Sequence, residues 1–444
     1  MTEGSIWKKM LLFALPILLG NIFQQLYNTF DAWVVGKYLG DHALAAVSSS
    51  ASLIFLMVGF FNGIAMGAGV IMARHFGAKD YDSLKKSIHT NIISALVAGC
   101  LLTVLGVAFT PTLLEWMGTP KDVLPQSVSY FRYYFCGAIF IVLYNTFVGI
   151  LHAVGDSRHP LYYLILSSII NVGLDLLFVG VFKWGVGSAA IATTISQGLS
   201  ALLCFLRLIR CKEPYRLELK KIRYHHKSML EIIQYGFPAG IQNSVISIAN
   251  VFVQTNINSF GSYAMAGCGA YSKLEGFAFL PVTCFTQALA TFVGQNLGAQ
   301  QYRRVKKGSI FGILCCVICA QLIGITFYIF APNFIGFFNV SGTALKFGVM
   351  NMQTICLFYG LLAFSHCAAS ILRGAGKSIV PMFVMLGFWC VLRVSYITIA
   401  LKYVNRLTTV SWAYPLTWAC SSVVFLGFLS NTKWLYNTKA KKQE

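Results

Sequence analysis

The stretch ARHFGAKDYDSLKK, at residues 73–86, returns later in the chain as GQNLGAQQYRRVKK, at residues 294–307. Two further pairs of segments lie at the same spacing of 221 residues: GDHALAAV (40–47) with GSYAMAGC (261–268), and ILHAVGDSRHP (150–160) with ILRGAGKSIVP (371–381). Three matches in one order and at one spacing indicate an internal duplication. We therefore expect two halves that share one architecture.

The chain is strongly apolar around these repeats. Of its 444 residues, 57% are hydrophobic and 11% are charged, and the mean hydropathy is +0.68. A soluble domain carries about 25% charged residues. Apolar runs recur that reach the roughly 20 helical residues needed to cross about 30 Å of hydrocarbon. The sequence therefore predicts an all-α polytopic membrane protein.

We predict twelve transmembrane helices in two six-helix lobes. They are expected near residues 10–36, 43–73, 88–110, 126–150, 160–180, 187–208, 229–257, 264–291, 308–330, 347–372, 379–401 and 408–430. The longest polar interval, RLIRCKEPYRLELKKIRYHHK (207–227), separates six helices from six. It predicts a first lobe at 1–206, a linker at 207–228, a second lobe at 229–430 and a tail at 431–444. Because six is even, both lobes begin and end on one side of the membrane, so the repeat is parallel.

The net charge of +20 is divided unevenly between alternate loops. If the N-terminus is cytoplasmic, the inner segments hold Lys8, Lys9, Arg74, Lys79, Lys85, Lys86, Arg158, a run from Arg207 to Lys227, Arg303, Arg304, Lys306, Lys307, Arg373, Lys377 and four lysines from Lys433 onward. The outer segments hold only Lys37, Lys121, Arg132, Lys183, Lys346, Lys402 and Arg406. This asymmetry predicts a multi-pass protein of the plasma or inner membrane with both termini in the cytoplasm. Nucleic acid is not an expected partner, because the basic residues separate spans and form no stripe with aromatic residues.

The sequence carries no recognisable catalytic set. It contains no H-E-x-x-H, no G-x-S-x-G and no acid cluster with metal-ligand spacing. Its 13 cysteines show no metal or disulfide spacing, and most lie in predicted spans, where cysteine behaves as a small hydrophobe. A membrane-embedded enzyme is therefore a less favoured alternative, and we expect no enzyme activity and no cofactor. A channel remains an alternative, which would show uncoupled flux.

Three acidic residues lie inside the predicted spans and away from their ends: Asp31, Asp175 and Glu275. An Asp at the centre of a bilayer costs about 2.5–3.5 kcal/mol on the insertion scale. Asp31 is the last residue of a polar stripe along one face of the first span. The residues of this stripe recur at steps of three and four, and the others are Asn21, Gln24, Gln25, Tyr27 and Asn28. Such a face must contact protein or water, since lipid cannot satisfy it.

The fifth and sixth spans add polar residues to this set. Asn171 and Asp175 are one helical turn apart in the fifth span, and Thr193 lies in the sixth. Two carboxylates facing one cavity can share a proton and release it when the cavity reopens. Alternatively, carboxylate, amide and hydroxyl oxygens together supply the hard ligands that Na⁺ favours. A third interpretation is helix packing, but packing alone rarely requires two acids where Asn would serve.

The second half repeats the predicted architecture of the first half but lacks its acidic residues at the equivalent positions. At the repeat spacing, Asp31 corresponds to Phe252 and Asp175 to Tyr396. Lys273 and Glu275 are two residues apart and point about 200° away from each other on a helix, so each needs another partner or water. We assign the following residues to a possible substrate cavity, with a structural role as the alternative: Gln24, Asn28, Gln197, Gln242, Asn250, Gln254, Lys273, Glu275 and Arg393.

Several of these segments resemble the multidrug and toxic compound extrusion family. They are ALPILLGNIFQQLYNTFDAWVVGKYLG (14–40), NVGLDLLFV (171–179), GSAAIATTISQ (187–197) and KLEGFAFLP (273–281), which are similar to that family's spans 1, 5, 6 and 8. The resemblance covers essentially the whole chain. It implies two lobes that export organic, often cationic, compounds in exchange for H⁺ or Na⁺. It also implies a cation site at Tyr27, Asp31, Asn171, Asp175 and Thr193, in which Asp31, Asn171 and Asp175 would bind the metal ion if the ion is Na⁺.

The residues and the resemblance together predict a monomeric antiporter in the lipid bilayer. Its expected substrates are small organic, amphipathic cations, and its coupling ion is H⁺ or Na⁺. An alternative within the same superfamily is a flippase for lipids or lipid-linked oligosaccharides. Such flippases often have more spans and a strongly cationic cavity, whereas this chain has twelve predicted spans and an acidic first half.

Overall fold

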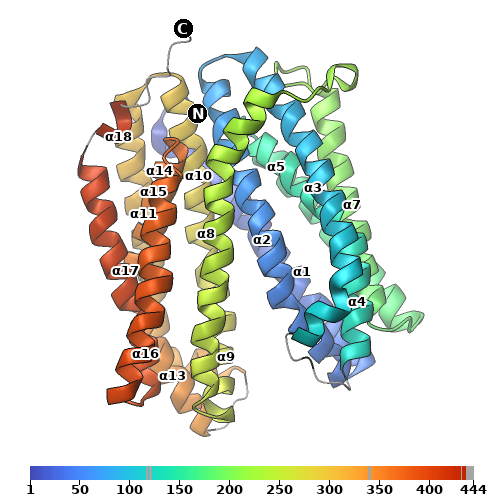
Figure 1. Ribbon diagram of the computed structural model, residues 1–444, viewed down its shortest axis with the longest axis vertical. Helices are drawn as coiled ribbons and strands as arrows, with labels where there is room; N and C mark the ends of the chain where they lie inside the picture. Colours follow the sequence, from blue (N-terminus) through green and yellow to red (C-terminus); the bar gives the residue numbers. More distant parts are fainter. Residues whose placement is uncertain (117–118, 120–122, 339–341, 432, 437–444) are drawn as a thin grey trace. The chain divides into compact units, whose positions relative to one another are not determined.

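A computed structural model of the chain (Figure 1) describes residues 1–116, 119, 123–338, 342–431 and 433–436. Side chains within these ranges are described except at 41, 42, 44, 45 and 48–58. The predicted loop charges Lys121 and Asp122 lie outside the described residues, as does the part of the predicted tail beyond Tyr436.

The described chain is built from α-helices with short π-helical and 3-10 segments. The first half contains α1 (Ile6–Leu39), α2 (Asp41–Gly77), α3 (Tyr81–Trp116), α4 (Leu124–Cys136), α5 (Ala138–Ala153), α6 (Arg158–Asp175), the π-helical η1 (Leu176–Val181), α7 (Gly187–Arg210) and the 3-10 turn η2 (Leu219–Lys221). The second half contains α8 (His226–Asn258), α9 (Ser262–Ala278), α10 (Leu280–Gly298), α11 (Tyr302–Ile329), α12 (Ala331–Gly336), α13 (Gly342–Cys356), α14 (Tyr359–Gly374), α15 (Ile379–Met385), the π-helical η3 (Leu386–Leu392), α16 (Arg393–Tyr403), α17 (Leu407–Ser430) and α18 (Lys433–Tyr436).

The predicted set of twelve spans is confirmed. Among the described residues, eight continuous helical segments are long and apolar enough to cross a membrane. Two pairs, α4 with α5 and α13 with α14, pass the same test together and are bent by 47° and 52°. The long helices α2 and α8, of 37 and 33 residues, complete the twelve. Gly137 lies at the first bend, between α4 and α5.

Contacts between residues divide the chain into two compact units. We call Leu15–Gly240 the N-unit, and we call Met1–Ala14 together with the chain from Ile241 onward the C-unit. Helices α1 and α8 therefore each contribute to both units. Both carry an internal proline close to the change of unit, Pro16 in α1 and Pro238 in α8. A proline inside a helix removes a backbone hydrogen bond and favours a bend.

Small residues bring helix backbones together inside the N-unit. Gly63 and Gly67 on α2 face Gly240 and Gly236 on α8, so that a Cβ at either α2 position would overlap the α8 backbone. Each helix thus presents two glycines four residues apart, the spacing that allows close helix packing in membranes. Any side chain at these four positions would force α2 and α8 apart.

The linker between the halves packs against the N-unit. Cys211, Tyr215 and Leu217 are buried in its apolar core. The Glu218 carboxylate accepts hydrogen bonds from Lys221 at 2.6 Å and Lys85 at 3.1 Å. These bonds lower the pKa of Glu218 from 4.5 to about 2. The linker is therefore fixed to α3 through Glu218 and is not a free tether.

In the C-unit, α11 holds the start of the chain. The Arg304 guanidinium donates hydrogen bonds to the backbone carbonyls of Met1 (3.1 Å), Glu3 (3.2 Å) and Gly4 (2.7 Å). Its charged face also lies 5.8 Å from the centre of the Phe292 ring. An arginine fork that binds several carbonyls restrains the segment that it holds. We call this arrangement the Arg304 clasp.

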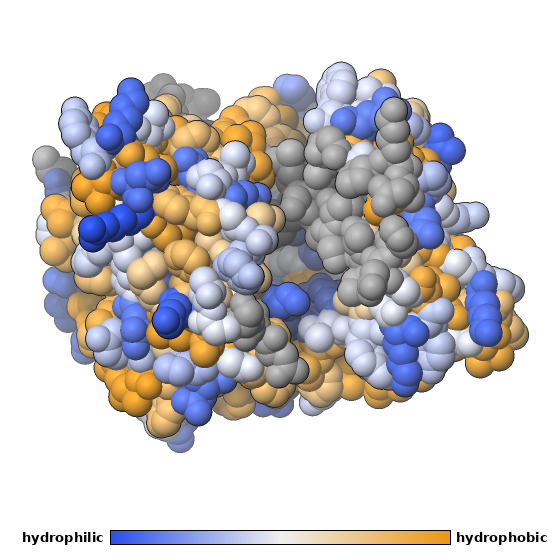
Figure 2. Space-filling view, turned by 90° about the horizontal axis from the view of Figure 1, so that it is seen from below, coloured by the Kyte–Doolittle hydropathy of each residue, from blue (hydrophilic) through white to orange (hydrophobic). Residues whose placement is uncertain are grey.

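Exposed apolar side chains cover the flanks of the helices. Val104, Ile169 and Val423 are 65%, 65% and 70% exposed. Figure 2, which looks at one end of the helices, shows hydrophilic residues mixed with apolar ones on that end. A soluble protein rarely leaves this much apolar surface in water. The distribution is that of a protein surrounded by lipid.

Candidate functional site

Three helices of the N-unit bring the predicted cation-site residues together. Helix α1 carries Tyr27 and Asp31, α6 carries Asn171 and ends at Asp175, and α7 carries Thr193. The π-helical segment η1 begins directly after Asp175. Single π-helical turns are frequent at functional sites, where they redirect a side chain from the regular helical face.

The polar contacts link α1 to α7 at two levels. The Thr193 hydroxyl lies 3.4 Å from Asp31 Oδ2, and Gln197 Nε2 donates a hydrogen bond of 3.1 Å to the Tyr27 hydroxyl. The carboxyl groups of Asp31 and Asp175 interact electrostatically with each other. Since two ionised carboxylates repel and both lack a donor, a proton or a cation between them would be favourable.

Most of the oxygen atoms at this site have no protein donor. Among the described residues, no hydrogen bond reaches Asp31 Oδ1, either carboxylate oxygen of Asp175, or the side-chain amide of Asn171. Asp175 is 0% exposed and Asn171 is 1% exposed. Uncompensated carboxylates in such a place are unfavourable. The site is therefore chemically suited to accept a cation.

The donor set suits a proton or an alkali metal ion better than a transition metal. The available ligands are carboxylate, amide and hydroxyl oxygens, which are hard donors. No group of three His, Cys, Asp or Glu residues with metal-binding geometry occurs in the described part of the chain. A proton can be shared by Asp31 and Asp175, whereas Na⁺ would also use the unpaired oxygen of Asn171.

Two tyrosines that the sequence analysis missed flank the acid pair. Tyr130 and Tyr134, both on α4, stack with their ring centres 6.3 Å apart. Tyr130 interacts electrostatically with Asp31 and Asp175, and Tyr134 with Tyr27. Their spacing of one helical turn was a usable signal, but tyrosine is common throughout this chain. These rings add an aromatic wall to the site.

The other predicted cavity residues of the N-unit lie farther along α1 and α7. Gln24 is half-buried and hydrogen-bonds to Tyr27. Gln197 is buried, and Asn28 is exposed. The polar stripe of α1 therefore continues from the acid pair to the surface of the N-unit.

In the C-unit, the most deeply buried charge is Arg393. It is 1% exposed, and it donates hydrogen bonds to Asn250 Oδ1 at 3.3 Å and Thr417 Oγ1 at 3.1 Å. Its guanidinium lies 4.5 Å from the ring centre of Tyr414 and 5.5 Å from that of Trp389. Cation–π contact with these two rings therefore offsets part of the cost of burying the Arg393 charge, as a carboxylate partner would otherwise do.

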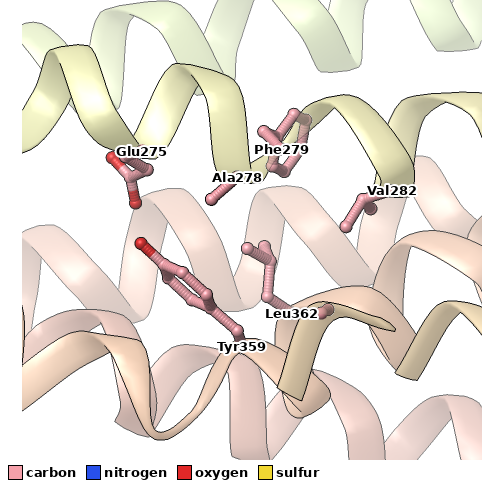
Figure 3. Close-up of a pocket in the computed structure, with 7 residues that line it drawn as sticks. Glu275, Ala278, Phe279, Val282, Tyr359 and Leu362 are labelled. Atoms are coloured by element: carbon pink, nitrogen blue, oxygen red, sulfur yellow. The ribbon is translucent and has the colours of Figure 1, made fainter. Parts of the chain in front are cut away.

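The acid of the C-unit is held by tyrosines. Tyr271 donates a 3.0 Å hydrogen bond to Glu275 Oε1, and its hydroxyl also lies 3.0 Å from that of Tyr359. Figure 3 shows Glu275 and Tyr359 facing each other at one end of a narrow pocket, whose walls include Phe279 and Leu362. A carboxylate beside aromatic and aliphatic walls is a polar end to an otherwise apolar pocket.

The remaining predicted cavity residues of the C-unit do not join this pair. Lys273 is exposed and lies 5.7 Å from the Phe338 ring centre, away from Glu275. Gln242 is buried against the Met385 sulfur at 2.9 Å, and Gln254 donates to Asn258 at 2.8 Å. These residues therefore lie at separate places in the C-unit.

Comparison with known proteins places both halves in one family. The model of the MatE family matches residues 16–177 and again residues 238–399. The "Probable multidrug resistance protein YoeA" of Bacillus subtilis (strain 168) is 29% identical over 96% of this chain and 94% of its own length. The "Multidrug export protein MepA" of Staphylococcus aureus (strain NCTC 8325 / PS 47) is 21% identical over 87% of this chain and 86% of its own.

Solved structures share the fold at lower sequence identity. A MOP superfamily transporter from Pyrococcus furiosus aligns with a TM-score of 0.92 at 21% identity, covering 98% of both chains. The outward-facing conformation of a multidrug resistance MATE family transporter aligns with a TM-score of 0.91, also at 21% identity and 98% coverage of both chains. At this level of identity, the likeness establishes the twelve-helix fold.

Proposed function

This chain belongs to the MatE family, and on that premise we propose that it is a secondary active antiporter that exports organic, amphipathic cations in exchange for H⁺ or Na⁺. The observation that carries the proposal is the acid pair Asp31 and Asp175, which is buried in the N-unit and lacks protein donors. The names of the relatives YoeA and MepA support multidrug compounds as the cargo.

The cycle couples a cation to the position of α1. In the outward-open state, H⁺ or Na⁺ binds between Asp31 and Asp175 and neutralises them. Neutralisation changes the contacts of Asp31 with Thr193 on α7, and so changes how α1 packs or bends near Pro16. This change expels the substrate, and the protein then returns to the inward-open state and releases the cation. Tyr27, Asn171 and Thr193 position the ion.

The membrane potential sets the size of this coupling. One charge that crosses 100 mV gains about 2.3 kcal/mol, which corresponds to roughly fiftyfold accumulation of a neutral substrate. A singly charged cationic substrate cancels this electrical contribution. Its export would then depend on the concentration gradient of the coupling ion. We also propose that the protein works as a monomer with its basic loops and both termini in the cytoplasm, because the charge distribution follows the positive-inside rule.

Dye efflux from cells tests the proposal. Cells that express the wild type, Asp31→Asn or Glu115→Gln would be loaded with ethidium, and its export would be followed by fluorescence at equal expression. Glu115 is an exposed acid near the end of α3 and serves as the matched control. We expect export by the wild type and the control, and loss of export in Asp31→Asn.

The driving ion follows from the same assay. A protonophore should abolish export if H⁺ drives it, whereas removal of external Na⁺ should do so if Na⁺ drives it. Equal export by Asp31→Asn and the wild type would show that Asp31 does not couple the ion. Export by neither would refute the cationic substrate class.

A further inference from the structure

A groove at one end of the C-unit is separate from both charged sites. It has a volume of about 490 Å³ and lies where the end of α11 meets α12 and α13. Its lining combines apolar and polar side chains: Tyr328, Pro332, Leu345, Val349 and Met350, with Lys346, Gln353 and Thr354. This volume is within the range of sites that bind small organic molecules.

The position of the groove along α11 sets its depth in the membrane. The apolar part of α11 begins after Lys307, which ends a basic segment that must lie in water. At 1.5 Å per residue, about 20 residues cross 30 Å of hydrocarbon. The opposite boundary therefore falls close to Tyr328. Tyrosine is enriched at that boundary, with its ring in the acyl region and its hydroxyl among the headgroups.

The surface beside the groove is apolar and exposed. Ile325 and Ile329 at this end of α11 are 41% and 62% exposed, and Phe330, which directly follows the helix, is 50% exposed. Leu345 and Val349, which line the groove, are four residues apart and so lie on one face of α13. The apolar part of the groove is thus continuous with a lipid-facing flank.

Lys346 gives the groove its only formal charge. It is exposed, and the ion pairs formed by the described residues all lie elsewhere. The polar neighbours are already bonded, because Gln353 donates to the Tyr328 carbonyl at 3.3 Å and Thr354 to the Met350 carbonyl at 2.8 Å. The groove therefore offers one unpaired cation at headgroup level above apolar walls.

We propose that this groove binds one anionic phospholipid. The lipid phosphate lies on the Lys346 ammonium, and one acyl chain runs along Leu345, Val349 and Met350. The charge argues against an exported organic cation, which Lys346 would repel. A zwitterionic lipid satisfies the apolar walls equally well but gains less from the lysine, so the site discriminates by headgroup charge.

Native mass spectrometry of the delipidated protein tests this site. The full-length chain would be titrated with phosphatidylglycerol or with phosphatidylcholine of the same acyl chains. One lysine near an anionic headgroup contributes about fivefold in affinity. We expect the wild type to bind one phosphatidylglycerol about fivefold more tightly than phosphatidylcholine, and Lys346→Gln to lose this preference. Lys402→Gln, which alters an exposed lysine in the last turn of α16, should keep it.

A second variant tests the acyl part of the site. Val349→Trp fills the groove and should weaken the binding of both lipids, while the thermal unfolding midpoint shows that the protein is folded. The proposal is overturned if Lys346→Gln keeps the preference for phosphatidylglycerol. It is also overturned if Lys402→Gln loses as much of the preference for phosphatidylglycerol, since the preference would then belong to the whole surface. A third refuting result is that Val349→Trp binds both lipids as tightly as the wild type does.

Discussion

Replacing Asp175 with Asn should abolish coupled export and, at the same time, make the protein more stable. Asp175 is 0% exposed, and neither of its carboxylate oxygens accepts a hydrogen bond from the described residues. Asn has the same shape without the charge, and its amide can donate to Asp31 Oδ1, which also lacks a donor. A site kept for coupling is expected to be costly in stability, so its removal should be favourable.

The size of the gain follows from burial of the charge. An Asp at the centre of a membrane helix costs about 2.5–3.5 kcal/mol. Part of this cost is already offset by Thr193, which lies 3.4 Å from Asp31, and by the environment that the two acids share. The substitution therefore recovers less free energy than the full cost. We therefore expect Asp175→Asn to raise the free energy of unfolding by about 1–3 kcal/mol. For a unit the size of the N-unit, each kcal/mol raises the unfolding temperature by roughly 2–4 °C.

The assay is thermal unfolding of the purified protein at alkaline pH, where the carboxylates are most costly, together with ethidium efflux. Asp156→Asn is the matched control, because the Asp156 carboxylate is paired with His159 at 2.7 Å and Arg207 at 3.8 Å. The same substitution there should lower the unfolding temperature. If Asp175→Asn lowers it as well, the acid pair stabilises helix packing and our reasoning about coupling is wrong.

Three further substitutions test the packing and charge contacts. Gly67→Ala places a methyl group against the backbone of Gly236 and should destabilise the protein by about 1–3 kcal/mol. The control Gly69→Ala should be tolerated, because its new Cβ would meet nothing closer than 3.8 Å. Equal unfolding temperatures of the two variants would contradict this prediction. Glu218 has a pKa of about 2 against 4.5 when unperturbed, so its hold on the linker is complete above pH 4.5 and is lost as the pH falls toward 2. The protection factors of the linker amides, which correct for the pH dependence of intrinsic exchange, should fall over that interval, and Glu218→Gln should remove the dependence. Arg393→Lys keeps the charge but loses the two-point contact and the stacking, so it should lower the free energy of unfolding by about 1–3 kcal/mol; an unchanged unfolding midpoint would refute that assignment.

The number and placement of the spans could be predicted because hydrocarbon thickness sets a minimum apolar length. The bends could not. Gly137 marks the bend between α4 and α5, but glycine is frequent in membrane helices and most of them continue through it. The π-helical segments η1 and η3 depend on how neighbouring helices pack, and that information is not local.

The acid pair was visible in the sequence because charge in a membrane helix is rare enough to be informative. Its surroundings were less visible. Tyr130 and Tyr134 lie on α4 on either side of the exposed Arg132, and nothing in their spacing shows which neighbour they face. Arg393 stood out as a charge, but its partners Asn250 and Thr417 come from helices far apart in the chain, so only the fold brings them together.

The Arg304 clasp has a consequence for how the chain is made. Arg304 is synthesised about 300 residues after the carbonyl of Gly4 that it binds. At 5–20 residues per second, this interval is roughly 15–60 s on the ribosome. Throughout it, the segment before α1 lacks the arginine that holds it, although the part of α1 from Leu15 onward can already pack within the N-unit. Residues 1–4 are thus among the last to reach their final contacts, and a chain that stops before α11 would never form the Arg304 clasp.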